Sequence, residues 1–229
     1  MKRLFAVLLA LVCVLGLTAC REDRGALAAK PVIYLYPEGD EQCDAKPVVY
    51  CYPEQGTEVT VTLDYAGELT CTYPAYDNGW TVTAYPDGTL TDADGQTYNY
   101  LYWEGVDDID YDFSQGFCIP GDDTAAFLED ALSQLGLTRR EANEFIVYWL
   151  PQMQESAYNL IAFQTDVYTE AAKLTVTPTP DTLLRVFMAW KPLTQPLDIP
   201  AQTLTAPERT GFTVVEWGGC RVDAQQRAE

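Results

Sequence analysis

The sequence of 229 residues contains no histidine. Catalysis by a Ser-His-Asp triad or a Cys-His pair is therefore excluded in its usual form, because both need an imidazole as the general base. Zinc sites built on histidine, including the H-E-x-x-H motif, are excluded for the same reason. The sequence also lacks G-x-x-x-x-G-K-[ST], G-x-G-x-x-G, C-x-x-C and S-x-x-K. Nucleotide binding, thioredoxin-like redox chemistry and penicillin-binding chemistry thus have no motif in this chain.

Basic residues are scarce, because 14 Lys and Arg stand against 34 Asp and Glu and give a net charge of −20. A protein that binds nucleic acid uses Lys and Arg to displace the counterions of the phosphates, so we expect no nucleic acid partner. The same negative field disfavours direct docking of the domain on anionic lipid head groups. The acidity is explained either by solubility or by attraction of cations and basic partners.

Apolar runs long enough for a transmembrane helix, which needs about 20 residues, are absent as well. The run at residues 4–17 is shorter, follows two basic residues and leads into L-T-A-C at residues 17–20. This order is typical of a secretory signal peptide. Its last four residues resemble the bacterial lipobox, whose cysteine receives a diacylglyceryl group before cleavage. The alternative is an ordinary signal peptide or an uncleaved anchor, with a chance cysteine.

We therefore predict a lipoprotein signal peptide over residues 1–19, lipidation of Cys20 and a tether over residues 20–29. The diacylglyceryl anchor would make the lipid bilayer a partner and hold the protein outside the cytoplasmic membrane, on its outer face. Such anchoring is effective because each buried methylene contributes about 0.8 kcal/mol. The mature chain would carry a net charge of −22, since the signal peptide contains two basic residues and no acidic ones.

Five cysteines remain once Cys13 leaves with the signal peptide and Cys20 is lipidated. They are Cys43, Cys51, Cys71, Cys118 and Cys220. An odd number leaves at least one thiol free or paired with another molecule. Cys51, Cys71 and Cys118 stand in apolar patterns that are typical of small core residues. Cys43 and Cys220 have polar neighbours and are the better candidates for a disulfide bond, which an exported protein can form.

A ten-residue segment occurs twice, as A-K-P-V-I-Y-L-Y-P-E at residues 29–38 and as A-K-P-V-V-Y-C-Y-P-E at residues 45–54. Prolines bound each copy, so each predicts a short strand at a sheet edge or at a strand start. The alternation puts four tyrosines on one face: Tyr34, Tyr36, Tyr50 and Tyr52. They could form a ligand-binding stripe of rigid rings with polar tips, or they could cover another layer of the fold.

Alternating apolar and polar residues predict an antiparallel β unit over residues 30–119, consistent with a sandwich. Residues 59–73 predict a hairpin that turns at Ala66-Gly67. After Pro120 the apolar spacing becomes helical and predicts a first helix to about Leu135. Thr138 and Glu141 then fit a capping box, which predicts a second helix that ends before Pro151.

The sequence as a whole predicts an α+β fold that is mainly antiparallel β and sandwich-like, with an inserted helical hairpin. The predicted organisation is a single domain over residues 30–220, with the β unit at 30–119, the helical hairpin at 122–150, β-strands that return to the same core at 156–218, and a disordered tail at 221–229. Whether the strands form one sheet system or two is left open.

Carboxylates are the remaining candidates for catalysis. Glu104 and Glu216 each lie beside a tryptophan and near a glycine, in Y-W-E-G at residues 102–105 and in V-E-W-G-G at residues 215–219. A carboxyl beside an indole could have a raised pKa and act as a general acid. Two such groups could flank a glycosidic bond, with Trp103 and Trp217 stacked on the sugar. The alternative is a structural role, with the acid in solvent or paired with Arg185.

An acidic loop could bind calcium through oxygen ligands from Asp107, Asp108, Asp110 and Asp112. The loop is not an EF-hand, because the glycine at the sixth position and the terminal glutamate are missing. Aspartates at turns also bond to their own backbone and need no metal. A calcium-stabilised surface module is therefore one hypothesis, and ordinary turn chemistry is the other.

Five runs, K-P-V-I-Y-L-Y-P, D-N-G-W, Y-W-E-G, Y-W-L-P and V-V-E-W-G-G, resemble an uncharacterised group of secreted lipoproteins of Gram-positive anaerobes. The resemblance covers most of residues 30–219 and implies no activity, although the duplicated segment departs from the single copy expected there. The sequence favours a membrane-anchored lipoprotein with a non-enzymatic binding or envelope-associated role and a peptide, glycan or protein ligand. A carboxylate-based glycan hydrolase that uses Glu104 and Glu216 is the enzymatic alternative.

Overall fold

The computed structural model describes residues 43–222. The predicted signal peptide, Cys20, the tether, and the first copy of the repeat with Tyr34 and Tyr36 lie outside the described residues. Most of the predicted tail lies outside them too, although the last strand extends to Arg221, one residue into that range.

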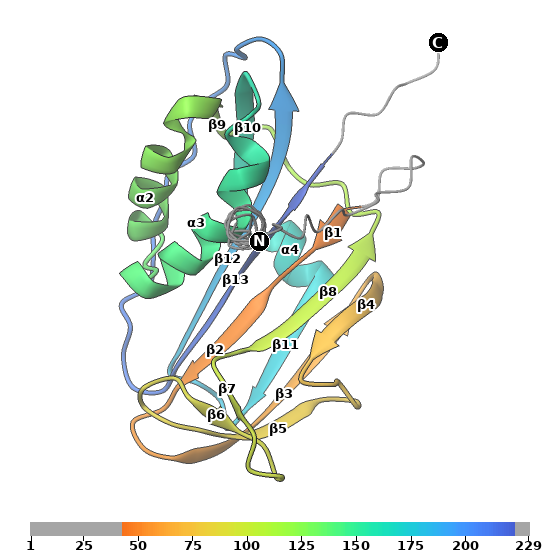
Figure 1. The fold of residues 1–229 in the computed structure, drawn as a ribbon, viewed down its shortest axis with the longest axis vertical. Coiled ribbons are helices and arrows are strands. Elements are labelled where there is room, and N and C mark those ends of the chain that lie inside the picture. Colours follow the sequence, from red (N-terminus) through yellow and green to blue (C-terminus); the bar gives the residue numbers. More distant parts are fainter. Residues whose placement is uncertain (1–42, 223–229) are drawn as a thin grey trace, which may run out of the picture. The chain divides into compact units, whose positions relative to one another are not determined.

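The described residues form two β-sheets and a helical hairpin (Figure 1). The eight-stranded sheet contains β1 (Cys43–Ala45), β2 (Val48–Tyr52), β4 (Glu68–Tyr73), β8 (Leu101–Asp107), β9 (Phe117–Pro120), β10 (Tyr158–Gln164), β12 (Thr182–Leu193) and β13 (Thr213–Arg221). Its order is β1-β8-β2-β13-β12-β10-β9, and β4 pairs with β8. The five-stranded sheet has the order β11 (Ala172–Thr177), β3 (Thr57–Tyr65), β5 (Trp80–Ala84), β6 (Leu90–Thr91) and β7 (Thr97–Tyr98).

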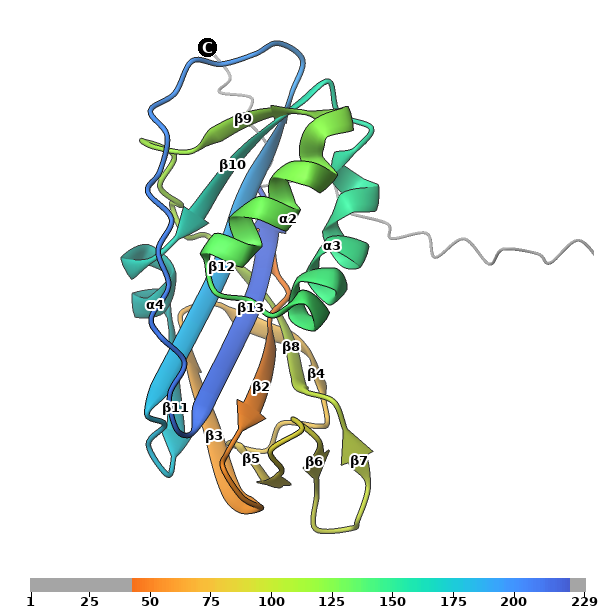
Figure 2. The same ribbon diagram turned by 90° about the vertical axis from the view of Figure 1, so that its left-hand side faces the viewer.

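The helices are α2 (Thr124–Gln134) and α3 (Arg139–Met153), a one-turn 3-10 helix η1 (Gly121–Asp123) ahead of them, and the short α4 (Asp166–Ala171). Figure 2 shows α2 and α3 across one face of β10, β12 and β13. All pairs between described strands are antiparallel except β12 with β13, which are parallel and joined by an irregular segment, residues 194–212, that we call the strap. The predicted fold class, a β-rich α+β fold with a helical hairpin, is confirmed.

The larger sheet is covered on both faces, and β2 illustrates why its sequence is almost wholly apolar. Val49 and Cys51 face the five-stranded sheet and join one core, which lies between the two sheets. Val48 and Tyr50 face α2 and α3 and join a second core, under the helices. Because adjacent residues of a strand point to opposite faces, a strand between two cores needs apolar residues at every position.

The helical hairpin follows its sequence signals closely. Thr138 and Glu141 form the predicted capping box, in which each side chain bonds the backbone N–H of the other. The predicted end before Pro151 is wrong, because α3 continues to Met153 with the proline inside it. Proline removes one N–H and leaves the carbonyl of Val147 without its donor. Val147 is on the exposed face of the helix, and Met153 is fully buried, so burial outweighs the lost bond.

The predicted hairpin over residues 59–73 is wrong. β3 pairs with β5 and β11 in the smaller sheet, whereas β4 pairs with β8 in the larger one. The chain crosses between the sheets at Gly67, where a Cβ would lie 2.2 Å from the carbonyl oxygen of Val106. Alternation in the sequence identified the two strands correctly, but it carries no information on their partners.

Candidate functional site

The tyrosines of the second repeat copy lie on the face of β2 that α3 covers. Tyr50 is buried, and its hydroxyl donates to Glu144 on α3. Its ring stacks on Tyr52 at 6.0 Å between centroids and meets Tyr100 edge-on at 5.4 Å. Burial, together with the bond to Glu144, raises the pKa of Tyr50. The two tyrosines therefore pack against the helical layer, which is one of the two roles expected for them.

Beside Tyr50, a cavity of about 390 Å³ opens between α3, β2, β8 and β13. Four of its nine lining residues are aromatic, and we call it the aromatic cleft. It is lined by Lys46, Val48, Asn99, Tyr100, Tyr102, Glu144, Val147, Tyr148 and Trp217. Tyr100, Tyr102 and Tyr148 are half-buried, whereas Asn99 and Val147 are exposed at the rim.

Charged and hydroxyl groups are held in fixed positions around the aromatic cleft. The ammonium of Lys46, an almost fully buried residue, lies 2.8 Å from a carboxylate oxygen of Glu104. The hydroxyl of Tyr102 donates to the same carboxylate, and burial together with this bond raises the pKa of Tyr102. Glu144 accepts from Tyr50 and lies 3.5 Å from Arg140, one helical turn away. The cleft thus combines ring faces with polar groups whose orientation is fixed by neighbours.

The two predicted catalytic carboxyls do not share a cleft. Glu104 is on the α3 side of the larger sheet, because its neighbour Trp103 belongs to the core between the sheets. Glu216 projects from the opposite face, since Trp217 belongs to the core under the helices. Glu216 is 1% exposed, and its carboxylate accepts from Arg185 at 2.5 Å. Glu104 and Glu216 therefore do not form the two-carboxyl geometry of a glycosidase, and Glu216 has the structural pairing with Arg185 that was the alternative.

The two tryptophans beside these acids also differ in their surroundings. Trp103 is fully buried between the sheets, where it meets Tyr65 edge-on at 4.9 Å, so it has no face available to a ligand. Trp217 packs against Phe145 of α3 at 5.4 Å and lines the aromatic cleft. Of the residues predicted to stack on a sugar, Trp217 borders the cleft and Trp103 does not.

The acidic loop is organised by hydrogen bonds to its carboxylates. Asp107 is buried and accepts from the hydroxyls of Tyr65 at 2.5 Å and Tyr111 at 3.1 Å. Burial raises the pKa of Asp107 in spite of these bonds. Asp112 accepts from the backbone N–H of Ser114 in a tight turn, while Asp108 and Asp110 point to solvent. Within residues 43–222, no group of three or more Cys, Asp or Glu is arranged to hold a metal ion.

The cysteines divide as follows. Cys220 is disulfide-bonded, while Cys51, Cys71 and Cys118 are free. Cys51 is buried in the core between the sheets, as predicted. Cys71 is exposed rather than in the core, because β4 is an edge strand with a bulge at this point. The side chain of Cys43 lies outside the described part of the chain, so its pairing with Cys220 stays a prediction.

Most residues of the aromatic cleft were not predicted from the sequence. Trp217 was a candidate, and Glu104 reaches the cleft through its ion pair with Lys46. Four other residues of the cleft were not predicted from the sequence: Lys46, Asn99, Tyr100 and Tyr148. The available signals were weak: Lys46 belongs to the repeat, and Tyr148 begins the Y-W-L-P run. The cleft brings together four segments that are far apart in the sequence, which a local pattern cannot reveal.

Comparison with known proteins gives one informative relative. The chain is 42% identical over 95 residues to a protein of Butyrivibrio fibrisolvens described as "Uncharacterized protein in bglA 3'region". The match covers 39% of this chain and 82% of the relative. No family model and no solved structure matches. Among the helices of residues 43–222, none is long and apolar enough to span a membrane.

Proposed function

This chain belongs to the family of that Butyrivibrio fibrisolvens protein, and we propose that it is a membrane-anchored extracytoplasmic lipoprotein that binds a glycan in the aromatic cleft. The anchor is the diacylglyceryl group expected on Cys20, which would keep the domain at the outer face of the cytoplasmic membrane. The role is one of binding, without chemical conversion of the ligand.

The aromatic composition of the cleft carries this proposal. The C–H face of a sugar ring packs well on aromatic rings, and Tyr100, Tyr102 and Tyr148 offer such rings with polar tips. Sugar hydroxyls need donors and acceptors, which Lys46, Asn99 and Glu144 can supply. The volume of about 390 Å³ is within the usual range for small-molecule sites, roughly 300–1,000 Å³.

The surroundings of the carboxylates support binding rather than hydrolysis. A retaining or inverting glycosidase needs one carboxyl free to protonate the leaving group and another to act as nucleophile or base. Glu104 is already bonded to Lys46 and Tyr102, and Glu144 is bonded to Tyr50 and Arg140. These contacts fit fixed recognition groups that orient sugar hydroxyls.

The test is isothermal titration of the full-length lipoprotein in detergent micelles with soluble muropeptides, cello-oligosaccharides and xylo-oligosaccharides. We expect at least one of these ligands to bind and to be recovered intact. Tyr148→Ala should weaken binding about tenfold, the equivalent of roughly 1.4 kcal/mol, because it removes one ring wall. Tyr85→Ala, which removes an exposed tyrosine from the turn that follows β5, is the matched control and should leave the affinity unchanged.

Two results would count against the proposal. Absence of binding to every glycan tested would reject the cleft as a glycan site. Cleavage of a bound oligosaccharide that is lost in Glu144→Gln would replace the binding role with a hydrolytic one.

A further inference from the structure

Over its first five residues, β12 pairs with a neighbouring strand on one side and has no strand on the other side among the described residues. β13 runs beside it from Thr182 to Trp190. On the other side, β10 ends at Gln164, which lies opposite Phe187. After Gln164 the chain leaves the larger sheet through α4 and enters β11 of the smaller sheet. Residues 182–186 of β12 are therefore a free sheet edge among the described strands.

The main-chain groups of Leu183 and Arg185 point to this free edge. Thr182 donates its N–H to Phe212 on the β13 side, and Trp190 accepts from Val222 on the same side. Main-chain groups of successive strand residues point to opposite edges, so those of the odd-numbered residues point away from β13. Within residues 43–222, neither Leu183 nor Arg185 has a main-chain hydrogen-bond partner across that edge.

At Phe163 on β10, another unpaired edge position, the protein itself supplies the missing hydrogen-bond partners. Phe163, near the end of β10, lies beyond the reach of β9, which pairs with residues 158–161. The side-chain amide of Gln202 on the strap replaces the missing strand: it accepts from the N–H of Phe163 at 2.8 Å and donates to its carbonyl at 2.9 Å. Leu183 and Arg185 have no such side-chain cap among the described residues, so the fold covers one exposed edge and leaves the next available.

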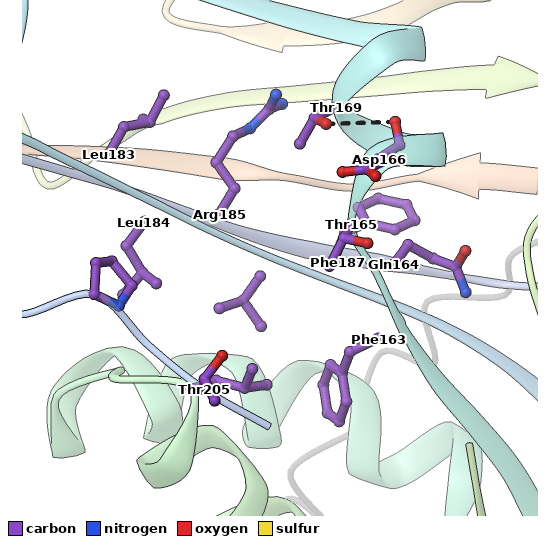
Figure 3. Close-up of a pocket in the computed structure, with 13 residues that line it drawn as sticks. Phe163, Gln164, Thr165, Asp166, Thr169, Leu183, Leu184, Arg185, Phe187 and Thr205 are labelled. Atoms are coloured by element: carbon purple, nitrogen blue, oxygen red, sulfur yellow. Dashed lines mark hydrogen bonds between the residues drawn. The ribbon is translucent and has the colours of Figure 1, made fainter. Parts of the chain in front are cut away.

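A cavity of about 410 Å³ lies along this edge, and we call it the edge groove. Figure 3 shows that its lining residues fall on both sides of β12. Leu183 and Arg185 point toward α4, where Asp166 and Thr169 form a polar wall. On the side of α2 and α3, the second wall is formed by Leu184 and Phe163 together with Thr205 of the strap. The groove therefore surrounds the position that one more strand would occupy.

We propose that the edge groove binds an extended peptide segment of a partner protein, which pairs with β12 as an added strand and carries alternating apolar and basic side chains. Strand addition supplies main-chain bonds to Leu183 and Arg185, and the alternation of a strand presents one set of side chains to each wall. The apolar set packs against Leu184 and Phe163.

Charge complementarity favours basic residues among the peptide side chains that face the α4 wall of the groove. Arg185 is already paired with the buried Glu216, whereas Asp166 is exposed at the groove. Residues 43–222 contain 27 Asp and Glu against 8 Lys and Arg, so the field around the groove attracts a cationic segment. This site is separate from the aromatic cleft and does not depend on the glycan ligand.

The probe is a fluorescent nine-residue peptide of alternating valine and lysine, titrated by anisotropy against the full-length lipoprotein in micelles. Asp166→Asn should weaken its affinity at least threefold, while Asp77→Asn, which removes another exposed charge from the loop between β4 and β5, should change it less than 1.5-fold. A peptide methylated on alternate backbone nitrogens should bind with an affinity at least tenfold lower. Hydrogen exchange of the Leu183 and Arg185 amides should slow when the unmodified peptide is bound.

Several outcomes would overturn the proposal. Equal binding of the methylated peptide would show that no strand is added, and equal binding of a valine–glutamate peptide would remove the charge preference. Failure of the valine–lysine peptide to bind would reject the site. Light scattering of the chain without peptide serves as a further check, because a dimer broken by Leu183→Pro would make a second copy of this chain the occupant.

Discussion

Arg209 on the strap and Glu141 in the first turn of α3 form an ion pair, with Arg209 Nη2 at 2.6 Å from Glu141 Oε2. Glu141 is fully buried, and its carboxylate also accepts from the backbone N–H of Thr138 in the capping box. Arg209 donates further to the carbonyl of Gly136 at the end of α2. One side chain of an irregular segment thus holds the junction between both helices of the hairpin.

Arg209→Met should destabilise the domain by about 3 kcal/mol, because it leaves the carboxylate of Glu141 buried without its cation. Urea unfolding at pH 7 measures the difference. Arg139→Met, which breaks an ion pair on the surface, should cost about 0.5 kcal/mol or less. An equal effect of both substitutions would contradict the role given to Arg209.

The pH dependence of this pair has a definite sign. Burial alone would raise the pKa of Glu141, but the hydrogen bonds from Arg209 and Thr138 outweigh it and lower the pKa. The pair therefore stabilises the domain fully above the ordinary carboxyl pKa, and this contribution is lost as the pH falls through the lowered pKa. The difference in unfolding free energy between wild type and Arg209→Met should be largest at pH 7 and smaller at pH 4.

Glu216→Gln should destabilise the domain by about 3 kcal/mol, because Arg185 would be left charged and buried between the sheets. Urea unfolding of Glu216→Gln, with the exposed Glu54→Gln as control, measures this effect. The double variant Arg185→Met, Glu216→Gln should recover part of the loss. Glycan binding should be unchanged, since Glu216 faces away from the aromatic cleft, and a selective loss of binding would mean that Glu216 contacts the ligand.

Stability should decline on the alkaline side of pH 10. Burial raises the pKa of Tyr50, Tyr65, Tyr102 and Tyr111 in the folded domain. Each of them contributes stability that is complete below the ordinary tyrosine pKa of about 10 and is lost as the pH rises above it, by about 1.4 kcal/mol per pH unit. Urea unfolding between pH 9 and 11.5, with tyrosinate absorbance as a second signal, tests this expectation.

The same titration has an internal control. With no histidine in the chain, and with the pKa of the Cys51 thiol raised by burial above its ordinary value, the unfolding free energy should be nearly constant between pH 6 and 8. Tyr65→Phe should make the alkaline decline less steep, because it removes one of the tyrosines whose pKa is raised in the folded domain. Ionisation of all tyrosines near pH 10 in a domain that stays folded would contradict the prediction.

Cys20→Ser should release the protein from the membrane, because the acyl anchor is the proposed attachment. In cells that make the wild type, the protein should fractionate with membranes, and its intact mass should correspond to a chain that begins at an acylated Cys20. Cys71→Ser, which changes an exposed free thiol, should leave fractionation unchanged. A wild-type product that starts at Met1 without fatty acid would exclude the anchor.

Local features were predictable from the sequence, whereas long-range ones were not. β10 (Tyr158–Gln164) lies within the range predicted to return to β structure, and the capping box at Thr138 forms, because both depend on residues a few positions apart. α4 was missed because six residues give almost no periodic signal. The sheet that residues 68–73 join was missed because their pairing partners on β8 are 29 or more positions away.

In the candidate site too, local features were predictable from the sequence and long-range ones were not. The carboxyls of Glu104 and Glu216 were grouped by their similar neighbours, yet Trp103 enters the core between the sheets and Trp217 the core under the helices, so the adjacent acids lie on opposite faces of the larger sheet. Tyr50 was correctly assigned to a tyrosine face, but its partner Glu144 lies 94 positions away on α3. The order of residues along a strand specifies a face, and packing decides what covers it.

The helices cover one face of the larger sheet and the second sheet covers the other. Ligands and partner proteins can therefore reach the larger sheet only along its edges. The aromatic cleft and the edge groove both lie there, where core residues such as Trp217 and Phe163 meet exposed residues such as Asn99 and Asp166. Side chains at such a border can be exchanged at small cost in stability, since surface substitutions typically change it by about 0.5 kcal/mol or less. Homologues could therefore diverge in what they recognise while they keep the same interior.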